Sequence, residues 1–508
     1  MIYSWFLSYP LTLNSPSDTV FNHISVFYWI SLAILLTSMF LIAVIHENHY
    51  SNWIISVGLF TVIYSISYFY AMVPGADSSS FAGLIKYFLT TNNLTPNVLS
   101  RYYYQWPSFF ILAKVMISVT GINLEKYAFL LYGIIGFLIT TTVYIYASKF
   151  CKRGGTVAVV AFTIVMFSFL NYQFAPFSLS FAILLILFML ETQPRSKSSL
   201  ITTFLLFFGI CIMHEFVPAI FILYLLIQSI LTKSAYYRNL FILFVGVYLT
   251  FQVTFVSYSF GIFIKQLISL PSDYSAYSSI ISSRLLPAKV PIDVVAQQFS
   301  RGVTISLGLI CVVGFIFLVS KRKLRPLDIG ILLTGIVYSG LGIVLNTIGY
   351  RTLPLIFLPL SLGAVFFFNG KLRPYFKAIF LILLVCVVFI PLHNSFTTYP
   401  ILFQSTADQT ASNFLIEKYD WASPTTILMY SGTAGYISPQ INTKTEIISE
   451  ASADYTSNFT KYDCIFYNIG LGITFDEKNI SFPLTPNGFN VVYDDGSSYI
   501  FEKIQHSP

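Results

Sequence analysis

The chain has 508 residues and a formal net charge of +7; 56% of its residues are hydrophobic and only 10% are charged. A soluble globular domain carries about a quarter charged residues, so this composition excludes an ordinary soluble protein. The mean hydropathy of +0.74 instead predicts a protein that lies in a lipid bilayer over most of its length.

Long apolar runs follow one another through most of the chain. A hydrocarbon core about 30 Å thick requires roughly 20 apolar residues per helix, and about twelve runs approach this length. They predict spans at residues 24–45, 53–72, 127–148, 154–170, 178–191, 199–213, 216–231, 237–260, 302–320, 327–348, 352–368 and 377–392. The predicted fold class is therefore a polytopic α-helical membrane protein, with residues 1–399 forming the transmembrane domain.

The basic residues gather in short connections between these runs. The clusters are Lys149, Lys152 and Arg153; Arg195 and Lys197; Lys233 and Arg238; Lys321, Arg322, Lys323 and Arg325; Lys371, Arg373 and Lys377. Threading the spans places all of them on one side, which makes that side cytoplasmic. Because each cluster lies a few residues from a span, nucleic acid is excluded as their partner. The loops at 73–126 and 261–301 and the residues after 393 are then external, and the apolar stretch around Val294 predicts a short interfacial helix.

Residues 400–508 have a soluble composition and predict a small extracytoplasmic α/β domain. A helix is expected around residues 407–415, with strands at 426–430, 446–449 and 464–467. Residues 491–493 and 499–501 predict a hairpin with an Asp-Gly turn. The domain lacks a base-and-nucleophile constellation, so we expect it to carry no catalytic group.

The external loop at residues 73–126 holds the strongest candidates for chemistry. Asp77 is the only acidic residue between Glu47 and Glu125, and it directly follows a predicted span. Apolar residues recur at helical spacing through 81–89, and Pro107 and Gly121 bound a second helical segment. Neither segment is long enough to cross a bilayer, so both predict interfacial helices on the outer membrane face.

The carboxylate of Asp77 has two interpretations. At the interface it can act as a general base toward a hydroxyl group, or help to hold a divalent cation such as Mg²⁺ or Mn²⁺ against a phosphate. It can instead be the N-cap of the helix that follows. Because Ser would serve equally well as an N-cap, we favour the functional interpretation.

A cluster of aromatic residues precedes Pro107. Tyr102, Tyr103, Tyr104 and Trp106, with Gln105 among them, can bind a sugar by stacking and hydrogen bonding. The same residues are equally typical of the aromatic belt at a membrane interface. The sequence leaves both interpretations open.

Three further candidates lie at the external ends of later spans. His214 can donate a hydrogen bond to a phosphate, and Glu215 can be a second acid that works with Asp77. Arg351 can hold a phosphate, because its guanidinium matches phosphate oxygens. The alternatives are a simple helix-end pair for His214 and Glu215, and snorkelling to lipid headgroups for Arg351.

Several of these features together resemble the GT-C superfamily of polytopic glycosyltransferases, above all its protein mannosyltransferase-like and aminoarabinose transferase-like members from archaea and bacteria. In the first external loop, the resemblance rests on Gly75–Asp77 after a span and on the Tyr104–Pro107 segment with its apolar run to Gly121. Later in the chain, it rests on His214, on Tyr350–Pro354 around Arg351, and on the terminal hairpin from Asn490 to Lys503. It implies a polyprenyl-phosphate-linked sugar as donor and maps the superfamily's first-loop acid onto Asp77. Two departures stand out: the loop follows the second span, which implies an added N-terminal helix, and the next external loop, Asn171–Phe177, lacks an acid.

The predicted function is transfer of a sugar from a polyprenyl-phosphate-linked donor to an external acceptor, which is a protein, a lipid or a glycan. Asp77 and Glu215 are the predicted catalytic residues, and the predicted substrate-binding residues are Tyr103, Tyr104, Gln105, Trp106, His214 and Arg351. The scheme requires no cofactor and has room for a divalent cation, Mg²⁺ or Mn²⁺. The C-terminal domain is expected to cover the cavity or to select the acceptor. The predicted location is the cell membrane, with several spans. The alternative is a transporter of lipid-linked saccharides or a non-catalytic membrane scaffold.

Overall fold

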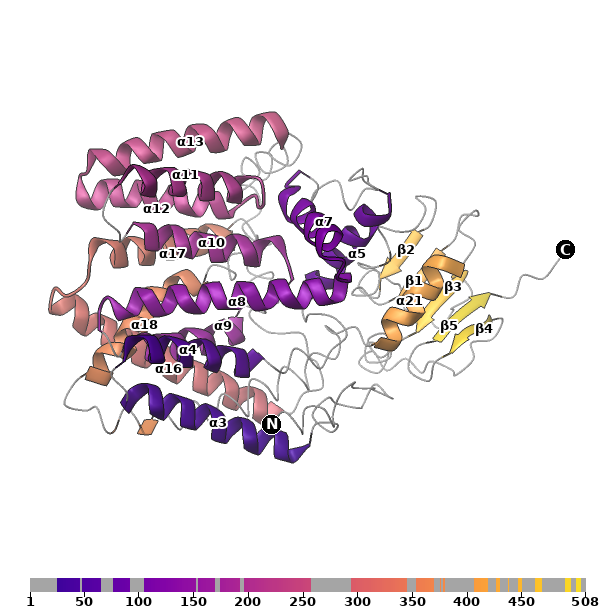
Figure 1. The fold of residues 1–508 in the computed structure, drawn as a ribbon, viewed down its shortest axis with the longest axis horizontal. Helices are drawn as coiled ribbons and strands as arrows, with labels where there is room; N and C mark the ends of the chain where they lie inside the picture. Colours follow the sequence, from indigo (N-terminus) through magenta and orange to yellow (C-terminus); the bar gives the residue numbers. More distant parts are fainter. Residues whose placement is uncertain are drawn as a thin grey trace.

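The structure is a computed structural model. It describes residues 25–45, 48–64, 76–91, 105–151, 154–169, 174–191, 196–256, 294–344, 353–369, 375, 378–379, 406–418, 426–429, 437, 446–449, 462–467, 489–494 and 499–503. Apolar helices lie side by side in one body, and a small sheet lies beyond one end of it (Figure 1).

The helical body consists of apolar helices that coincide with the predicted runs. They are α3 (Val26–Ile45), α4 (His49–Tyr64), α8 (Leu124–Ser148), α9 (Gly154–Phe169), α10 (Pro176–Leu190), α11 (Lys197–Cys211), α12 (Val217–Thr232), α13 (Ala235–Phe255), α16 (Val294–Ser320), α17 (Pro326–Val344) and α18 (Leu353–Asn369). Among the described residues, α8 and α13 are long and apolar enough to cross a membrane by themselves, and most of the others contain shorter apolar helices of 10–17 residues. The number of spans stays a prediction, and the run at 377–392 lies almost wholly outside the described residues.

Helices α16 and α18 approach each other closely because glycines lie at their crossing. A Cβ atom added to Gly314 of α16 would collide with the backbone of Gly363, and one added to Gly363 of α18 would collide with the backbone of Cys311. Small residues at such contacts let helix backbones approach in a membrane, where packing rather than the hydrophobic effect drives association.

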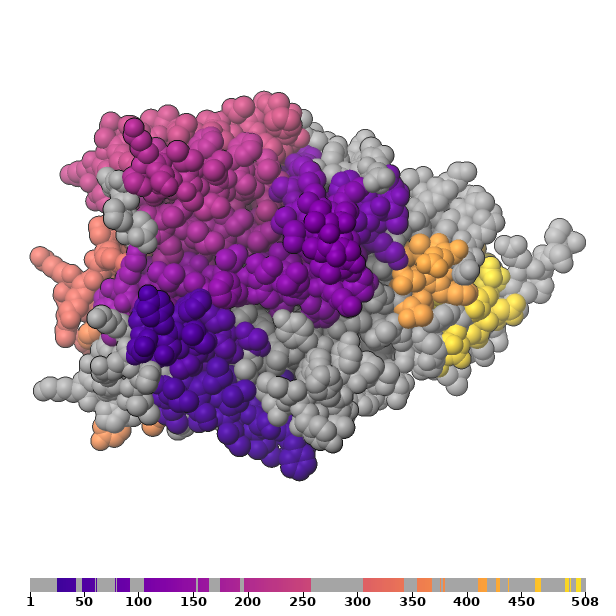
Figure 2. Space-filling view, viewed as in Figure 1, coloured from indigo at the N-terminus to yellow at the C-terminus, as the bar shows by residue number. Residues whose placement is uncertain are grey.

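Two short helices lie between this body and the sheet. They are α5 (Ala76–Thr91) and α7 (Ser108–Thr120), and both form where the sequence predicts interfacial helices. Pro107 precedes α7 directly, and Gly121 ends it with a φ of 69°, a left-handed conformation that suits glycine. The rings of Phe81 and Phe109 pack edge to face and join the two helices. Figure 2 shows this pair on the surface beside the C-terminal sheet.

The C-terminal part is a mixed five-stranded sheet in the order β2-β1-β3-β5-β4. Its elements are α21 (Thr406–Lys418), β1 (Thr426–Met429), β2 (Glu446–Ser449), β3 (Cys464–Tyr467), β4 (Phe489–Asp494) and β5 (Tyr499–Lys503). Strand β1 pairs in parallel with β2 and β3, while β5 pairs antiparallel with β3 and β4. The helix and strands lie where the sequence predicts them; the Asp-Gly turn lies outside the described residues. Buried residues of this part belong to the same continuous hydrophobic core as the helical body.

One sequence-based expectation is wrong. The stretch around Val294 is not a separate short helix, because it forms the first turns of the continuous 27-residue helix α16. The sequence also gives no indication that Asp328, in the first turn of α17, is 0% exposed.

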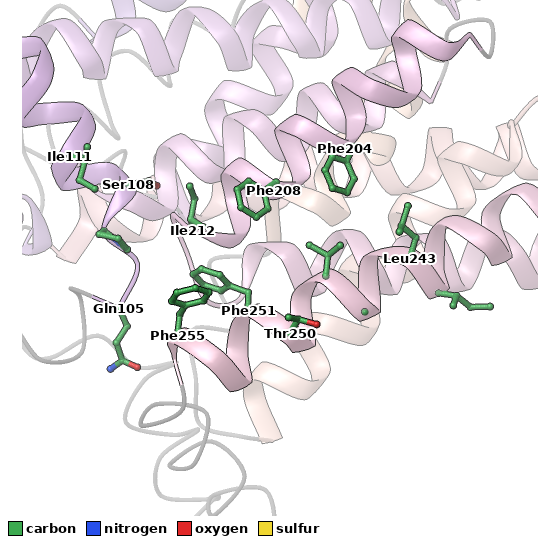
Figure 3. Close-up of a pocket in the computed structure, with 14 residues that line it drawn as sticks. Gln105, Ser108, Ile111, Phe204, Phe208, Ile212, Leu243, Thr250, Phe251 and Phe255 are labelled. Carbon is green, nitrogen blue, oxygen red and sulfur yellow. The ribbon is translucent and has the colours of Figure 1, made fainter.

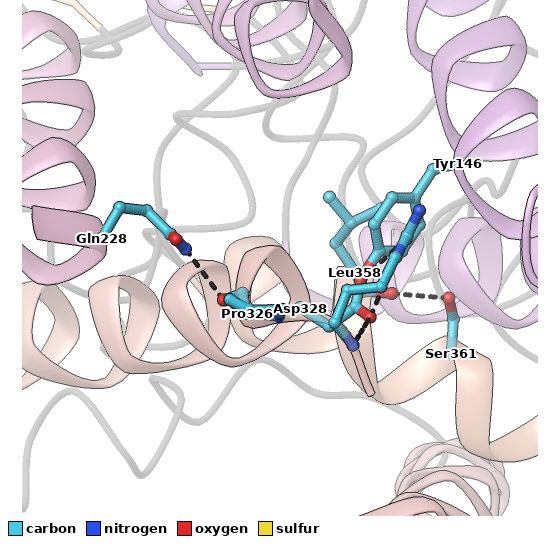
Figure 4. A network of polar contacts seen from close by, with 7 residues as sticks. Tyr146, Gln228, Pro326, Asp328, Leu358 and Ser361 are labelled. Atoms are coloured by element: carbon cyan, nitrogen blue, oxygen red, sulfur yellow. Dashed lines mark hydrogen bonds and ion pairs between the residues drawn. The ribbon is translucent and has the colours of Figure 1, made fainter. Parts of the chain in front are cut away.

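One end of the helical body carries the basic residues Lys149 and Lys321–Arg325 and is called the basic end below. Asp328 is the centre of a polar cluster at this end (Figure 4). Its Oδ1 accepts hydrogen bonds from the Tyr146 hydroxyl at 2.7 Å and from Arg325 Nη2 at 2.8 Å. Its Oδ2 accepts from Arg325 Nε at 3.1 Å and from the Arg325 backbone N–H at 2.8 Å. Nearby, the Gln228 side-chain amide donates to the carbonyl of Pro326 at 2.8 Å. The cluster therefore joins the start of α17 to α8 and α12.

Candidate functional site

The segment Gln105–Ser108 lies directly against the end of α11. The backbone N–H of Ser108 donates to the carbonyl of Ile212 at 3.3 Å. Trp106 is 4% exposed and packs with Phe251 and Val256, beside Ile212. Gln105 is buried as well, at 7% exposure. These contacts bring the predicted residues Gln105 and Trp106 to the turn that carries His214 and Glu215.

That turn, residues 212–216, joins α11 to α12 and fixes the state of the His214 ring. The backbone N–H of Phe216 donates to His214 Nδ1 at 3.2 Å. A ring nitrogen that accepts a hydrogen bond carries no proton, so the neutral ring holds its proton on Nε2. The ring also lies edge-on to Phe177, with 5.4 Å between centroids. In this tautomer His214 is a hydrogen-bond donor through Nε2.

Two tyrosines from other helices hold the same turn by its backbone. The hydroxyl of Tyr248, on α13, donates to the carbonyl of Glu215 at 2.8 Å. The hydroxyl of Tyr338, on α17, donates to the carbonyl of Phe216 at 3.4 Å. Together with the Ser108 contact, these bonds hold the end of α11 and the turn by the backbone carbonyls of Ile212, Glu215 and Phe216.

The first turn of α5 is tied to the same region. Helix α5 begins at Ala76, so Asp77 lies at its second residue, inside the helix and not at the N-cap position. The neighbouring Ser78 is buried, and its Oγ accepts a hydrogen bond from the backbone N–H of Phe174 at 2.9 Å. Three positions later along that chain segment, Phe177 contacts His214. Asp77 therefore belongs to the helix turn that adjoins the His214 region, while its side chain lies outside the described part of the structure.

An apolar groove of about 900 Å³ opens beside this region, between α7, α11 and α13 (Figure 3). Gln105, Ser108 and Thr250 are its polar lining residues, and the hydroxyl oxygen of Ser108 is itself buried; the other lining residues are apolar, among them Phe204, Phe208, Phe251 and Phe255. Gly246 also lines the groove, and a Cβ added there would meet nothing within 4 Å. The lining suits an apolar ligand whose polar end lies near Gln105.

The structure thus brings four of the predicted residues, Gln105, Trp106, His214 and Glu215, to one end of the helical body. Tyr103, Tyr104 and Arg351 lie outside the described residues. Their roles, and those of the four assembled residues, stay predictions. Sequence reasoning missed Ser78, Tyr248, Tyr338 and Gly246, because isolated hydroxyls and a glycine in apolar helices produce no motif.

A bound metal ion would need several carboxylate, imidazole or thiolate groups close together. Within the described residues, no group of three or more His, Cys, Asp or Glu side chains could hold a metal ion. The involvement of Mg²⁺ or Mn²⁺ stays a prediction.

No protein-family model and no curated protein sequence matches this chain. The structure is nevertheless similar to the crystal structure of ArnT from Cupriavidus metallidurans bound to undecaprenyl phosphate, with a TM-score of 0.54 and 11% sequence identity over 89% of this chain and 98% of that one. The apo structure of the same ArnT gives a TM-score of 0.53 and 11% identity over 90% of this chain and 99% of that one.

At this level of identity the similarity shows the fold alone. ArnT is an aminoarabinose transferase and a GT-C glycosyltransferase. The resemblance inferred from the sequence is therefore confirmed for the architecture, and the helical fold of this chain is similar to that of the membrane protein ArnT.

Proposed function

We propose that this protein is a membrane glycosyltransferase that moves a sugar from a polyprenyl-phosphate-linked donor to an acceptor on the external face of the membrane. The observation that carries the proposal is the apolar groove, whose polar end adjoins the His214–Glu215 turn. The ArnT whose fold the chain shares binds undecaprenyl phosphate, a ligand with one long apolar chain and one phosphate.

The groove would orient the donor more than it would bind it tightly. A polyprenyl chain leaves a bilayer that is as apolar as the groove, so its transfer yields little hydrophobic free energy. The ring faces of Phe204 and Phe208 on α11 and of Phe251 and Phe255 on α13 instead give the chain a defined course. A fixed course places the phosphate and the sugar at one location, and correct placement is itself a large part of catalysis.

The reaction assigns a role to each predicted residue. Asp77 removes the proton of the acceptor hydroxyl while that oxygen attacks the anomeric carbon of the sugar. The bond between this carbon and the phosphate oxygen breaks, and polyprenyl phosphate leaves with the electron pair. Arg351 and the Nε2–H of His214 stabilise the phosphate charge, and Glu215 is a second acid near the acceptor. Tyr103, Tyr104, Gln105 and Trp106 surround the sugar.

The groove can be blocked without disturbing the fold. Gly246→Leu adds a side chain where a Cβ meets nothing within 4 Å, so it narrows the groove without a backbone collision. We expect it to lower transfer from a long-chain donor about tenfold and to spare a donor with a short, water-soluble chain. The measurement is transfer of labelled sugar by purified protein in nanodiscs.

Gly209→Leu is the matched control. Its added Cβ also meets nothing within 4 Å, but Gly209 does not line the groove, so transfer should be unchanged. Asp77→Asn should reduce transfer from both donors, and an unchanged rate would remove Asp77 from its proposed role. If lipid-linked saccharide crosses proteoliposomes without any bond being formed, the protein is a transporter and the proposal fails.

A further inference from the structure

Lys86 lies at the junction of three elements. It is a half-buried residue of α5, and its Nζ donates a hydrogen bond to Asn413 Oδ1 of α21 at 2.5 Å. Glu417, one turn further along α21, attracts the ammonium group, and so does Glu125 in the first turn of α8. Lys86 therefore joins an interfacial helix, the helical body and the C-terminal domain.

The surroundings of Lys86 differ from those of a snorkelling lysine. Burial lowers the pKa of Lys86 from its usual 10.5, while the carboxylates of Glu417 and Glu125 oppose this effect. A snorkelling lysine buries its aliphatic stem but keeps its ammonium in water, so its ammonium would lose little hydration. Here the ammonium is partly dehydrated and is stabilised by specific partners, as expected of a contact that defines a position.

Helix α5 connects this junction to the proposed site. Asp77 and Lys86 are nine residues apart on α5, which corresponds to about 14 Å along a helix. The first turn of α5 is held through Ser78 and Phe174, and its last turn through Lys114 Nζ, which donates to the carbonyl of Phe88 at 3.2 Å. A helix of this length moves as a unit, so a displacement of α21 at Lys86 would reach the turn that contains Asp77.

We propose that Lys86 is a positioning residue through which the C-terminal domain sets the orientation of α5 and, with it, of Asp77. The inference rests on the proposed function in one respect, the role of Asp77 as the base. It assigns the domain a part in organising the site in addition to covering the cavity or selecting an acceptor. The ammonium group itself does not touch the reacting atoms.

The test combines hydrogen exchange and kinetics on the full chain in nanodiscs. Lys86→Met keeps the length of the side chain and removes its charge, and Asn413→Leu removes the acceptor. We expect both to raise amide exchange in the first turns of α5 about tenfold or more, because a lost hydrogen bond to a charged group corresponds to at least that factor. The kcat for transfer should fall to a similar extent while the KM for the donor stays unchanged.

Two controls make the result specific. Lys86→Arg should preserve both readouts, because it keeps the charge and the donor. Lys126→Met removes an exposed lysine near the start of α8 and should change neither. Unchanged exchange in Lys86→Met and Asn413→Leu overturns the inference, as does raised exchange with an unchanged kcat. If the wild type transfers no sugar from any donor, the proposed function fails, and exchange still decides whether Lys86 holds α5.

Discussion

A partly buried cation lies near each end of the helical body, and the two cations are held in different ways. At the basic end, Arg325 forms an ion pair with the fully buried Asp328, and the Tyr146 hydroxyl completes the carboxylate's contacts. At the opposite end, Lys86 donates to the neutral amide of Asn413, and carboxylates act on it from nearby. Arginine stays charged in proteins, whereas a buried lysine can lose its proton.

The buried tyrosines at the two ends differ in the same sense. Tyr146 donates to the carboxylate of Asp328, so its hydroxyl is part of a charged cluster. Tyr248 and Tyr338 donate to the backbone carbonyls of Glu215 and Phe216, so they fix the path of a turn. At the basic end, the side chains thus bind one another in a charged cluster. At the opposite end, the tyrosines bind the backbone of the turn, and the side chains of His214 and Glu215 are not used for these contacts. This difference agrees with the proposal that the chemistry takes place at the end that carries the His214–Glu215 turn.

The largest expected effect comes from removing the carboxylate at the basic end. Asp328→Ala leaves the guanidinium of Arg325 without its partner and the hydroxyl of Tyr146 without its acceptor. Because Asp328 and Tyr146 are fully buried while Arg325 is partly exposed, we expect the loss of this carboxylate to lower the unfolding free energy by about 3 kcal/mol. Thermal or denaturant unfolding in detergent measures the loss. Transfer per folded molecule should stay near that of the wild type; a large fall would show that the basic end also takes part in function.

A matched pair of tyrosine substitutions separates the two ends with a smaller effect. Tyr146→Phe should lower the unfolding free energy by about 2 kcal/mol, because its hydroxyl binds a charged group, and should spare transfer. Tyr248→Phe should lower the unfolding free energy by only about 1 kcal/mol, because the acceptor of its hydroxyl is a neutral carbonyl. It should nevertheless slow transfer about tenfold, because the His214–Glu215 turn loses a hydrogen bond that holds it in place. Unfolding and transfer are measured on the same preparations. Equal effects of both variants on transfer would contradict the contrast between the ends.

The elements that the sequence predicts well are those governed by local rules. Pro107 and Gly121 bound α7 because a fixed φ suits a helix start and a left-handed residue suits its end. The strands coincide with their predicted positions because each is a short run of mainly apolar residues, several of them β-branched or aromatic. In β1 and β3 consecutive residues are buried, as expected of strands covered on both faces. The error at Val294 has an equally local cause: Gln297, Gln298 and Arg301 interrupt the apolar run, but polar side chains do not stop the backbone hydrogen bonds of α16.

The site depends on contacts between distant residues, and these leave no signal in one sequence. Ser78 and Phe174 are 96 positions apart, and Tyr248 and Glu215 are 33 apart. A single serine or tyrosine in an apolar helix has no periodicity that would mark its partner. Asp328 was overlooked for a related reason, because an acid at the end of a span is indistinguishable from a solvated helix end until its neighbours are known.

The smallest expected effect concerns the proton affinity of Lys86 and tests whether charge on α21 influences the contact between Lys86 and Asn413. The carboxylate of Glu417 stabilises the ammonium form and so raises the pKa of Lys86 against the lowering by burial. Glu417→Gln removes this support, so the proton should leave more easily and the pKa should fall further below the usual lysine value. Titration of ¹³C-methylated lysines by NMR, with Lys86→Arg used to assign the resonance, measures the shift. Glu125→Gln should act in the same direction but less, because Glu125 is the weaker of the two influences. An unchanged or raised pKa in Glu417→Gln would mean that α21 does not hold its carboxylate beside Lys86, and that this carboxylate does not stabilise the ammonium form of Lys86.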